Sequence, residues 1–280
     1  MQVAVIGGTG VIGSCVVAEL AARGHTPLVV SRTPPAGGPA AAPGGPAALG
    51  GAQTVAEHRR ADLRSGDGLA AALDGVEAVV DASNDQRARR DELAHASRTL
   101  LAAEAAAGVG HHVAISIVGC DRAAVGYYRA KVAQEEAVTS GPVSWSLLRA
   151  TQFHQLVAWA LAAAGRVRLR PTGRALIQPI DPAVVATPLV DAVQAGPGGR
   201  LPDVGGPRVQ TLSELAADWR AHGGGAALPL PLPLRLMGAT GRVLRDGGLT
   251  APDAAAPGLT FAQWLERDRD PAAVRESAGR

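Results

Sequence analysis

A glycine-rich turn near the N-terminus constrains the fold of this chain more than any other feature. The segment VIGGTGVIG follows a short apolar run, Gln2–Ile6, and opens a stretch with helical spacing. Such a turn lets the backbone approach a phosphate, which the free N–H groups and the positive end of the helix dipole then bind. The turn therefore predicts a dinucleotide site, with contacts from Gly7, Thr9, Gly10, Val11, Ile12 and Gly13.

Strands and helices alternate along the first half of the chain. We expect strands at Gln2–Ile6, Pro27–Val30, Thr54–Glu57, Val76–Asp81, His112–Ile117 and Val143–Leu148, and helices at Val11–Arg23, Gly68–Leu73, Arg87–Ala107 and Gly126–Thr139. Continuous apolar strands separated by helices are typical of a parallel sheet covered on both faces. Right-handed crossovers then give an α/β fold with a Rossmann-type doubly wound sheet. The Pro/Gly/Ala-rich segment Thr33–Gly51 is expected to be an irregular, mobile surface loop.

The pattern is weaker after Arg149. We expect helices at Gln152–Ala163, Ala183–Val193, Leu212–Ala221, Leu234–Arg245 and Phe261–Arg267, and short strands at Val167–Leu169 and Ile177–Pro179. Alternating prolines exclude a regular helix or a central strand at Leu228–Arg235. Because no linker or repeat interrupts the chain, we predict one domain over residues 1–280, with a small C-terminal substrate-binding cap from about 151–280.

Composition argues against several classes of protein. Cys15 and Cys120 lie far apart and form no CxxC pair, so neither a disulfide framework nor a metal site is expected. No apolar run reaches the length of a membrane span, and no dense basic block carries interleaved aromatic residues. We therefore expect a cytoplasmic protein, monomer or homodimer, that binds a small molecule rather than a membrane or a nucleic acid.

The end of the second strand indicates which dinucleotide binds. An acidic residue about 20 positions past the glycines would accept the ribose 2′-hydroxyl of NAD. Ser31 and Arg32 stand there instead, and arginine pairs well with a 2′-phosphate, so NADP(H) is preferred over NAD(H). The alternative is that Arg32 is an ordinary exposed loop residue.

Two further places on the sheet are predicted to contact the cofactor. Asp62 and Leu63 follow the third strand, where Asp62 suits the exocyclic amine of adenine or, equally, a position near a helix N-cap. Ala82 and Ser83 leave the fourth strand where the cofactor should pass.

One predicted helix holds Tyr127 and Lys131, which is the single lysine among 27 basic residues. Four residues apart, the two side chains share a helix face. A phenol has a pKa of about 10, and a nearby ammonium together with a positive nicotinamide favours the phenolate. The pair therefore predicts proton transfer alongside hydride transfer, with Lys131 also binding the nicotinamide ribose and Ser116 orienting a substrate oxygen. Coincidental spacing is the alternative.

These residues resemble the short-chain dehydrogenase/reductase superfamily. The segments SIVGCD, GYYRAKVAQEEAV and WSLLRATQFHQ are similar to its atypical, NmrA-like NAD(P)H-binding group, over roughly Met1–Val193, and FAQWLERD resembles that group's final helix. The resemblance implies that residues after LRAT approach the nicotinamide, which makes Phe153 a cofactor contact and Gln152 a pocket candidate. For His154 we favour a helix-face histidine over proton transfer.

Many atypical members lack the catalytic tyrosine, and some bind the nucleotide only as sensors. This chain keeps Ser116, Tyr127 and Lys131, although the serine-to-tyrosine spacing is shorter than usual. We therefore expect an NAD(P)-dependent oxidoreductase that reduces a carbonyl, quinone or conjugated small molecule with NADPH, with Tyr127 as the proton donor. The alternatives are an NADP(H)-binding redox sensor without turnover and a non-redox isomerase or cyclase.

Overall fold

The computed structural model describes residues 1–33, 56–84, 90–123, 125–225 and 227–267. The chain divides into two compact units. Unit 1 holds Met1–Ser116, Gly126–Arg149 and Val185–Pro202, and unit 2 holds Ile117–Val125, Ala150–Val184 and Asp203–Arg280. Apart from Thr33, the predicted surface loop lies outside the described residues. The expectation of one domain with a C-terminal cap stays a prediction.

Unit 1 is built on a seven-stranded sheet with the order β3-β2-β1-β4-β5-β6-β9. Its strands are β1 (Gln2–Ile6), β2 (Thr26–Ser31), β3 (Glu57–Arg60), β4 (Ala78–Asp81), β5 (His111–Ile117), β6 (Trp145–Ala150) and β9 (Gly199–Arg200). β1 pairs in parallel with both β2 and β4, so the strand order reverses between β1 and β4. This confirms the Rossmann-type α/β class, in which ligands bind beyond the carboxyl ends of the strands at the point of reversal.

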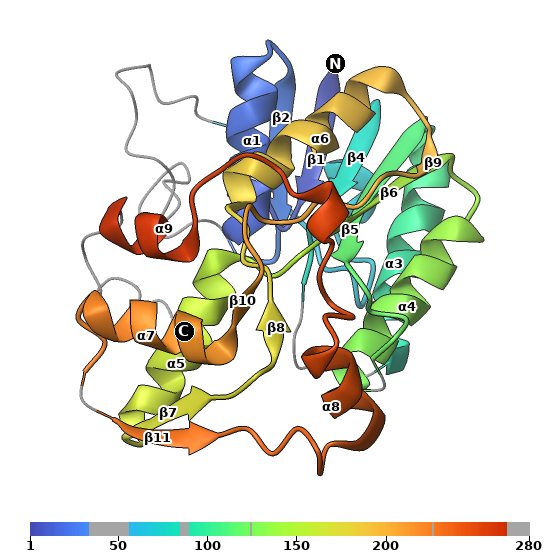
Figure 1. Ribbon diagram of the computed structural model, residues 1–280. Coiled ribbons are helices and arrows are strands. Elements are labelled where there is room, and N and C mark those ends of the chain that lie inside the picture. The colour runs from blue at the N-terminus through green and yellow to red at the C-terminus, as the bar shows by residue number, and fades with distance from the viewer. Residues whose placement is uncertain (34–55, 85–89, 124, 226, 268–280) are drawn as a thin grey trace. The chain divides into compact units, whose positions relative to one another are not determined.

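Helices cover both faces of this sheet (Figure 1). They are α1 (Val11–Ala22), α2 (Leu69–Ala72), α3 (Arg90–Ala107), α4 (Gly126–Thr139) and α6 (Pro182–Ala195), whose first three residues belong to unit 2. On one face, Leu69 of α2 and Leu100 of α3 pack in a core with Ile6, Leu28 and Val30. α3 and α4 pack on β5 and β6 in the same way. The opposite face belongs to α1 and α6.

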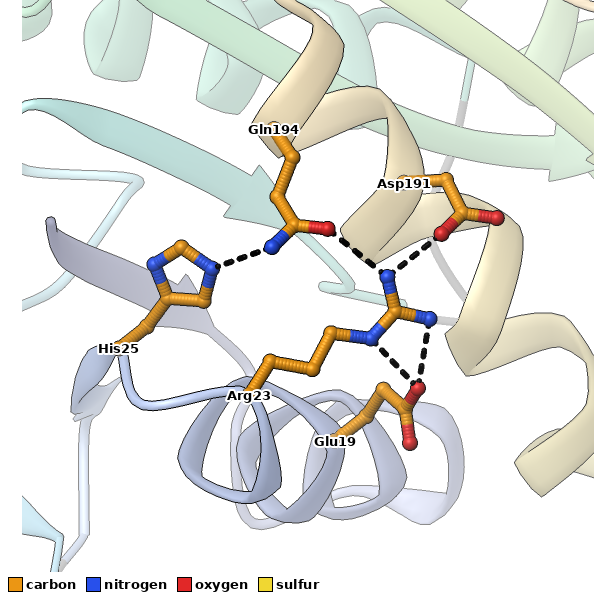
Figure 2. A network of polar contacts seen from close by, with 5 residues as sticks. All are labelled: Glu19, Arg23, His25, Asp191 and Gln194. Atoms are coloured by element: carbon orange, nitrogen blue, oxygen red, sulfur yellow. Dashed lines mark hydrogen bonds and ion pairs between the residues drawn. The ribbon is translucent and has the colours of Figure 1, made fainter.

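A polar network joins α1 to α6 (Figure 2). Arg23, which caps the C-terminus of α1, donates to Asp191 at 2.5 Å and to Gln194 at 2.9 Å, both on α6, and to Glu19 at 2.9 Å within its own helix. The amide of Gln194 in turn donates to the ring of His25 at 3.1 Å. The hydrogen bond to Asp191, and to a smaller extent that to Glu19, raises the pKa of Arg23. Arg23 is therefore a cation that links α1 to α6.

A buried ion pair connects α3 to β5. His112 and Glu104 are both fully buried, and Nδ1 of the histidine lies 2.9 and 3.0 Å from the two carboxyl oxygens. Burial lowers the pKa of His112, but the charge and hydrogen bond of Glu104 outweigh it and raise the pKa overall. Burial also raises the pKa of Glu104 by more than His112 lowers it. The folded pair therefore holds its protons to higher pH than the unfolded chain does.

Glu104→Gln is expected to lower the free energy of unfolding by about 3 kcal/mol at pH 6, because it removes one partner of a buried pair. The raised pKa of His112 stabilises the fold fully below its unfolded value of about 6.5, and this contribution is lost as the pH rises through the folded value. Urea unfolding of both proteins from pH 6 to 9 should therefore show a difference that shrinks with pH. Burial lowers the pKa of His154 to about 4, and this contribution is the same in both proteins; burial, and then the charge on His112, lower the pKa of His111 to about 4. A difference that grows with pH would contradict this assignment.

Unit 2 contains two small two-stranded sheets and a separate core. Its elements are α5 (His154–Arg166), β7 (Leu169–Thr172), β8 (Leu176–Ile177), β10 (Gln210–Thr211), α7 (Leu212–Ala221), β11 (Leu228–Pro231), α8 (Gly238–Arg245), a 3-10 turn (Pro252–Ala254) and α9 (Phe261–Arg267). β10 pairs antiparallel with β8, and β11 pairs parallel with β7. Trp219, Phe261 and Trp264 dominate the core between α5, α7 and α9. No helix in the described part of the chain is long and apolar enough to cross a membrane.

Several strands differ from expectation: β3, β7 and β8 have other bounds than predicted, and β9, β10 and β11 form where no strand was predicted. For β11 and β3 the physical reason is clear. The leucine–proline segment forms β11, an edge strand whose one partner is β7. The N–H of Leu228 donates to the carbonyl of Arg168, just before β7, and the N–H of Leu232, just after β11, donates to Thr172, while the prolines between them have no N–H to donate. The third strand of the large sheet, Glu57–Arg60, begins where the predicted one ends. It is a charged, half-exposed edge strand, so apolar periodicity does not reveal it.

Candidate functional site

The glycine turn between β1 and α1 brings three backbone segments into contact. Gly7 has a φ of +72°, and its N–H donates to the carbonyl of Val30 on β2 at 2.9 Å. A Cβ atom at Gly7 would lie 3.1 Å from the carbonyl oxygen of Ala82. One at Gly13 would lie 2.2 Å from the carbonyl oxygen of Gly7. The turn therefore has room only for glycine at these two positions, and it lies beside the end of β4.

The first turn of α1 offers hydrogen-bond donors to an anion. The N-cap residue is Gly10, so no side chain accepts a hydrogen bond from the first N–H groups of the helix, and the first turn carries no acidic residue. The first helical hydrogen bond runs from the N–H of Ser14 to the carbonyl of Gly10, so the N–H groups of residues 11–13 precede it. Thr9 and Gly10 are exposed. These residues fit the pyrophosphate of a dinucleotide, held by backbone donors and the positive end of the helix.

The ends of β2 and β4 flank this turn. Ser31 ends β2, and Arg32 follows it with an exposed side chain. The N–H of Ala82 donates to the carbonyl of Ile6 at 3.1 Å, and Cα of Ser83 would lie 3.2 Å from a Cβ at Gly7. The structure thus brings the predicted contacts of β2 and β4 to the two sides of the glycine turn.

Asp62 closes a turn after β3. Its Oδ1 accepts the N–H of Arg64 at 2.8 Å. Its backbone N–H donates to the carbonyl of Asp67, and its carbonyl accepts the N–H of Gly66. Leu63 is half-buried against the core under α2. One carboxyl oxygen of Asp62 therefore stabilises the turn after β3. A contact between the other oxygen and adenine stays a prediction.

Lys131 lies in a buried polar chain that crosses from α4 to the sheet. Its Nζ donates to the carbonyl of Ile115 on β5 at 3.0 Å and to Oε1 of Gln134 at 2.6 Å. Nε2 of Gln134 donates to Oδ2 of Asp81 at 3.2 Å, and Oδ1 of Asp81 accepts the N–H of Ser83 at 3.0 Å. Lys131 is 4% exposed as a residue, so these hydrogen bonds hold a buried lysine at the end of the sheet.

The three predicted catalytic residues all belong to unit 1. Ser116 is buried and directly follows Ile115, whose carbonyl Lys131 binds, so the lysine holds the end of β5 beside the serine. Tyr127 is half-buried in the first turn of α4, and its hydroxyl donates to Oδ1 of Asn84 at 2.7 Å. Because Asn84 follows Ser83, this bond brings the tyrosine to the end of β4.

Sequence reasoning missed three residues of this arrangement: Asp81, Asn84 and Gln134. Two of them left a signal. Asp81 is a carboxylate at the end of an otherwise apolar buried strand. Burying a carboxylate costs free energy unless another group binds it, so its position indicates a partner. Gln134 lies three residues after Lys131 and shares its helix face. Asn84 follows the strand in a loop, where no periodicity applies.

The residues directly after β6 belong to unit 2 and make their contacts within it. Phe153 is the N-cap residue of α5, and its role as a cofactor contact stays a prediction. The amide of Gln152 donates to the carbonyl of Leu249 at 3.0 Å and accepts the N–H of Gln178, which is a structural role. His154 is fully buried, stacks on Trp264, and burial lowers its pKa to about 4. A neutral core histidine fits these facts better than a proton donor.

The fold and the glycine turn of unit 1 define a dinucleotide-binding protein of the Rossmann class. A family described as NAD(P)H-binding matches residues 7–194, which is about two thirds of the 280 residues. The chain belongs to this NAD(P)H-binding family, and its resemblance to the NmrA-like short-chain dehydrogenase/reductase group is confirmed. No curated protein matches the chain.

Solved structures share the fold over nearly the whole chain. An NADPH-dependent quinone oxidoreductase, QOR2 of Escherichia coli, complexed with NADPH, is 20% identical with a TM-score of 0.72, covering 94% of this chain and 98% of its own. A UDP-glucose 4-epimerase of Thermotoga maritima, solved with UDP-glucose, is 15% identical with a TM-score of 0.68, covering 99% of each chain. MoeE5, solved with UDP-glucuronic acid and NAD, is 18% identical with a TM-score of 0.70, covering 99% and 100%. At these identities the likeness establishes the fold alone.

Proposed function

We propose that this protein is an NADPH-dependent oxidoreductase that reduces the carbonyl group of a small molecule, with a quinone as the leading substrate class. The observation that supports it most is the buried ammonium of Lys131, fixed by Gln134 and Ile115 one helical turn from Tyr127. Burying a cation is costly, and a chain that otherwise uses arginine keeps a lysine at this one place. The likeness to a quinone oxidoreductase in complex with NADPH agrees with this choice.

In the proposed reaction, bound NADPH supplies a hydride, which carries two electrons to the substrate carbonyl carbon. The hydroxyl of Tyr127 would give its proton to the carbonyl oxygen, so that an aldehyde or ketone becomes an alcohol. A quinone would become a hydroxydienone, which then loses the added hydrogen from carbon as a proton and gains a proton on its other oxygen to give the hydroquinone. Lys131 would favour the phenolate that remains, because the two residues lie one helical turn apart on α4. Asn84 now accepts the hydrogen bond of Tyr127, and it would hold the ring in place until a substrate oxygen takes that bond.

Ser116 and Arg32 complete the assignment. Ser116 would orient the substrate oxygen from the end of β5, and Arg32 would pair with the 2′-phosphate that distinguishes NADPH from NADH. The monomer or homodimer state and the cytoplasmic location expected from the sequence stay predictions.

A sugar-nucleotide isomerase is the second candidate, because two of the similar structures were solved with UDP-sugars. A redox sensor that binds NADP(H) without turnover is the third. The three differ in what they do with NADPH. An oxidoreductase consumes it with a carbonyl acceptor, an isomerase consumes none overall, and a sensor only binds it.

The deciding experiment mixes the purified protein with NADPH and a panel of quinones and aldehydes, and follows the loss of absorbance at the wavelength of the reduced nicotinamide. Binding of NADPH is measured in parallel by fluorescence. Acceptor-dependent oxidation supports the proposal. Tight binding without oxidation on any acceptor would favour the sensor, and conversion of a UDP-sugar without net oxidation would favour the isomerase. Binding of neither NADPH nor NADH would overturn all three.

A further inference from the structure

Side chains of β3 share a sheet face with the end of β2. The register pairs Val29 with His58 and Ser31 with Arg60, so all four side chains point to the same side. That side is the face of the glycine turn, because a Cβ at Gly8 would lie 3.1 Å from Cγ1 of Val29. The predicted 2′-phosphate contacts therefore have two basic neighbours that sequence reasoning did not consider.

The alternation along β3 separates a structural arginine from an unused one. Arg59 points to the opposite face, where it donates to Glu57 at 2.8 Å and to the carbonyl of Asp74 at 2.9 Å, beside the end of α2. Arg60 is exposed. In the described part of the chain, the guanidinium groups of Arg60 and Arg32 form no hydrogen bond or ion pair. The carboxylate of Glu57 is thus bound by Arg59 on the face away from the glycine turn. On the face of the glycine turn, β3 carries only the basic side chains of His58 and Arg60.

The hydrogen bonds of Ser31 fix the role of His58. The hydroxyl of Ser31 donates its proton to the carbonyl of Thr33 at 2.8 Å. Nε2 of His58 lies 2.9 Å from the same oxygen, so the histidine must be the donor in that contact. His58 therefore holds the Ser31 oxygen in place, and the hydroxyl proton can turn from Thr33 to a phosphate oxygen while that oxygen keeps its position.

We propose that β3 completes the cofactor-specificity site, with Arg60 as a direct contact to the ribose 2′-phosphate and His58 as a positioning residue for Ser31. The inference rests on the proposed function, in which NADPH is the cofactor. A phosphate dianion between Arg32, just after β2, and Arg60, at the end of β3, would gain charge-assisted hydrogen bonds from two guanidinium groups. NADH, which has a hydroxyl at this position, would gain neither.

The test measures the dissociation constants of NADPH and NADH by fluorescence for the whole protein at one fixed ionic strength. Arg60→Gln is expected to weaken NADPH about tenfold, the loss of one charge-assisted hydrogen bond, and to leave NADH within about twofold. His58→Leu is expected to lower the NADPH-to-NADH preference about threefold to fivefold. His58→Gln keeps an N–H donor for Ser31 and is expected to restore most of the preference.

Arg59→Gln is the matched control on the same strand, since it should lower the melting temperature and leave the preference unchanged. Competition by adenosine 2′,5′-bisphosphate against ADP checks that the change lies in the 2′-phosphate contact. A wild-type protein that prefers NADPH, with a preference that Arg60→Gln does not alter, would overturn this inference and leave the proposed function standing. A wild-type protein that binds both nucleotides equally would overturn the inference together with the preference for NADPH. Binding of neither nucleotide would reject the proposed function itself.

Discussion

Tyr127→Phe is expected to lower kcat for carbonyl reduction by about 10²- to 10⁴-fold, which is the range that a positioned general acid contributes. The affinity for NADPH should stay within about twofold, because the hydroxyl donates to Asn84 and not to the glycine turn. The phenyl ring keeps its contact with Tyr128, whose centroid lies 5.8 Å away, so the helix start is preserved. Single-turnover oxidation of bound NADPH, mixed with the best acceptor of the panel, measures the effect directly.

Tyr128→Phe is the matched control, since it removes the same hydroxyl one residue along the helix and should leave kcat near the wild-type value. The pH profile of kcat adds a second readout, because loss of the general acid should remove one limb of the profile. Full activity of Tyr127→Phe would mean that solvent supplies the proton, and the role assigned to the tyrosine would be wrong. Loss of activity in Tyr128→Phe alone would shift that role by one residue.

The large sheet was predictable because its strands are buried on both faces. β1 and β4 are apolar throughout apart from Gln2 and Asp81, and each ends at glycine or polar residues that mark its carboxyl end. The helix α1 was predictable because glycines bound it at both ends, with Gly24 in a positive-φ conformation after it. β3 was misplaced because an edge strand needs no apolar face. The turn after α2 binds Arg59 and Ser31 binds His58, while Arg60 is exposed.

The site was predictable only where its residues lie close together in the sequence and form a recognisable motif. The glycine turn and the tyrosine–lysine spacing are local patterns, so the sequence reveals them directly. The hydrogen bonds from Lys131 through Gln134 to Asp81 join residues 50 positions apart in the chain, and only the packing of α4 on the sheet brings them together. A role of Lys131 beside Tyr127 stays a prediction; the structure shows that the ammonium of Lys131 binds Gln134, whose amide in turn donates to the carboxylate of Asp81.

Gly13→Ala is expected to weaken NADPH binding by at least about hundredfold. The new methyl carbon would lie 2.2 Å from the carbonyl oxygen of Gly7 and 2.8 Å from Cα of Gly8, and backbone atoms on both sides cannot yield as a flexible side chain would. The turn must therefore move away from α1, which displaces the donors that bind the pyrophosphate. Loss of two charge-assisted hydrogen bonds, each worth about 1.5–3 kcal/mol, corresponds to a change of this size.

Gly10→Ala is the control for this prediction. Gly10 has a φ of −83°, which any residue adopts, and a Cβ there would lie 3.2 Å from the nearest atom, the carbonyl oxygen of Gly7. It should weaken NADPH binding less than tenfold. Circular dichroism and thermal unfolding establish that both variants are folded before titration with NADPH. Equal affinities in Gly13→Ala and Gly10→Ala would show that the close packing of α1 on the turn does not shape the nucleotide site, because the two changes add the same methyl group and differ only in what it meets.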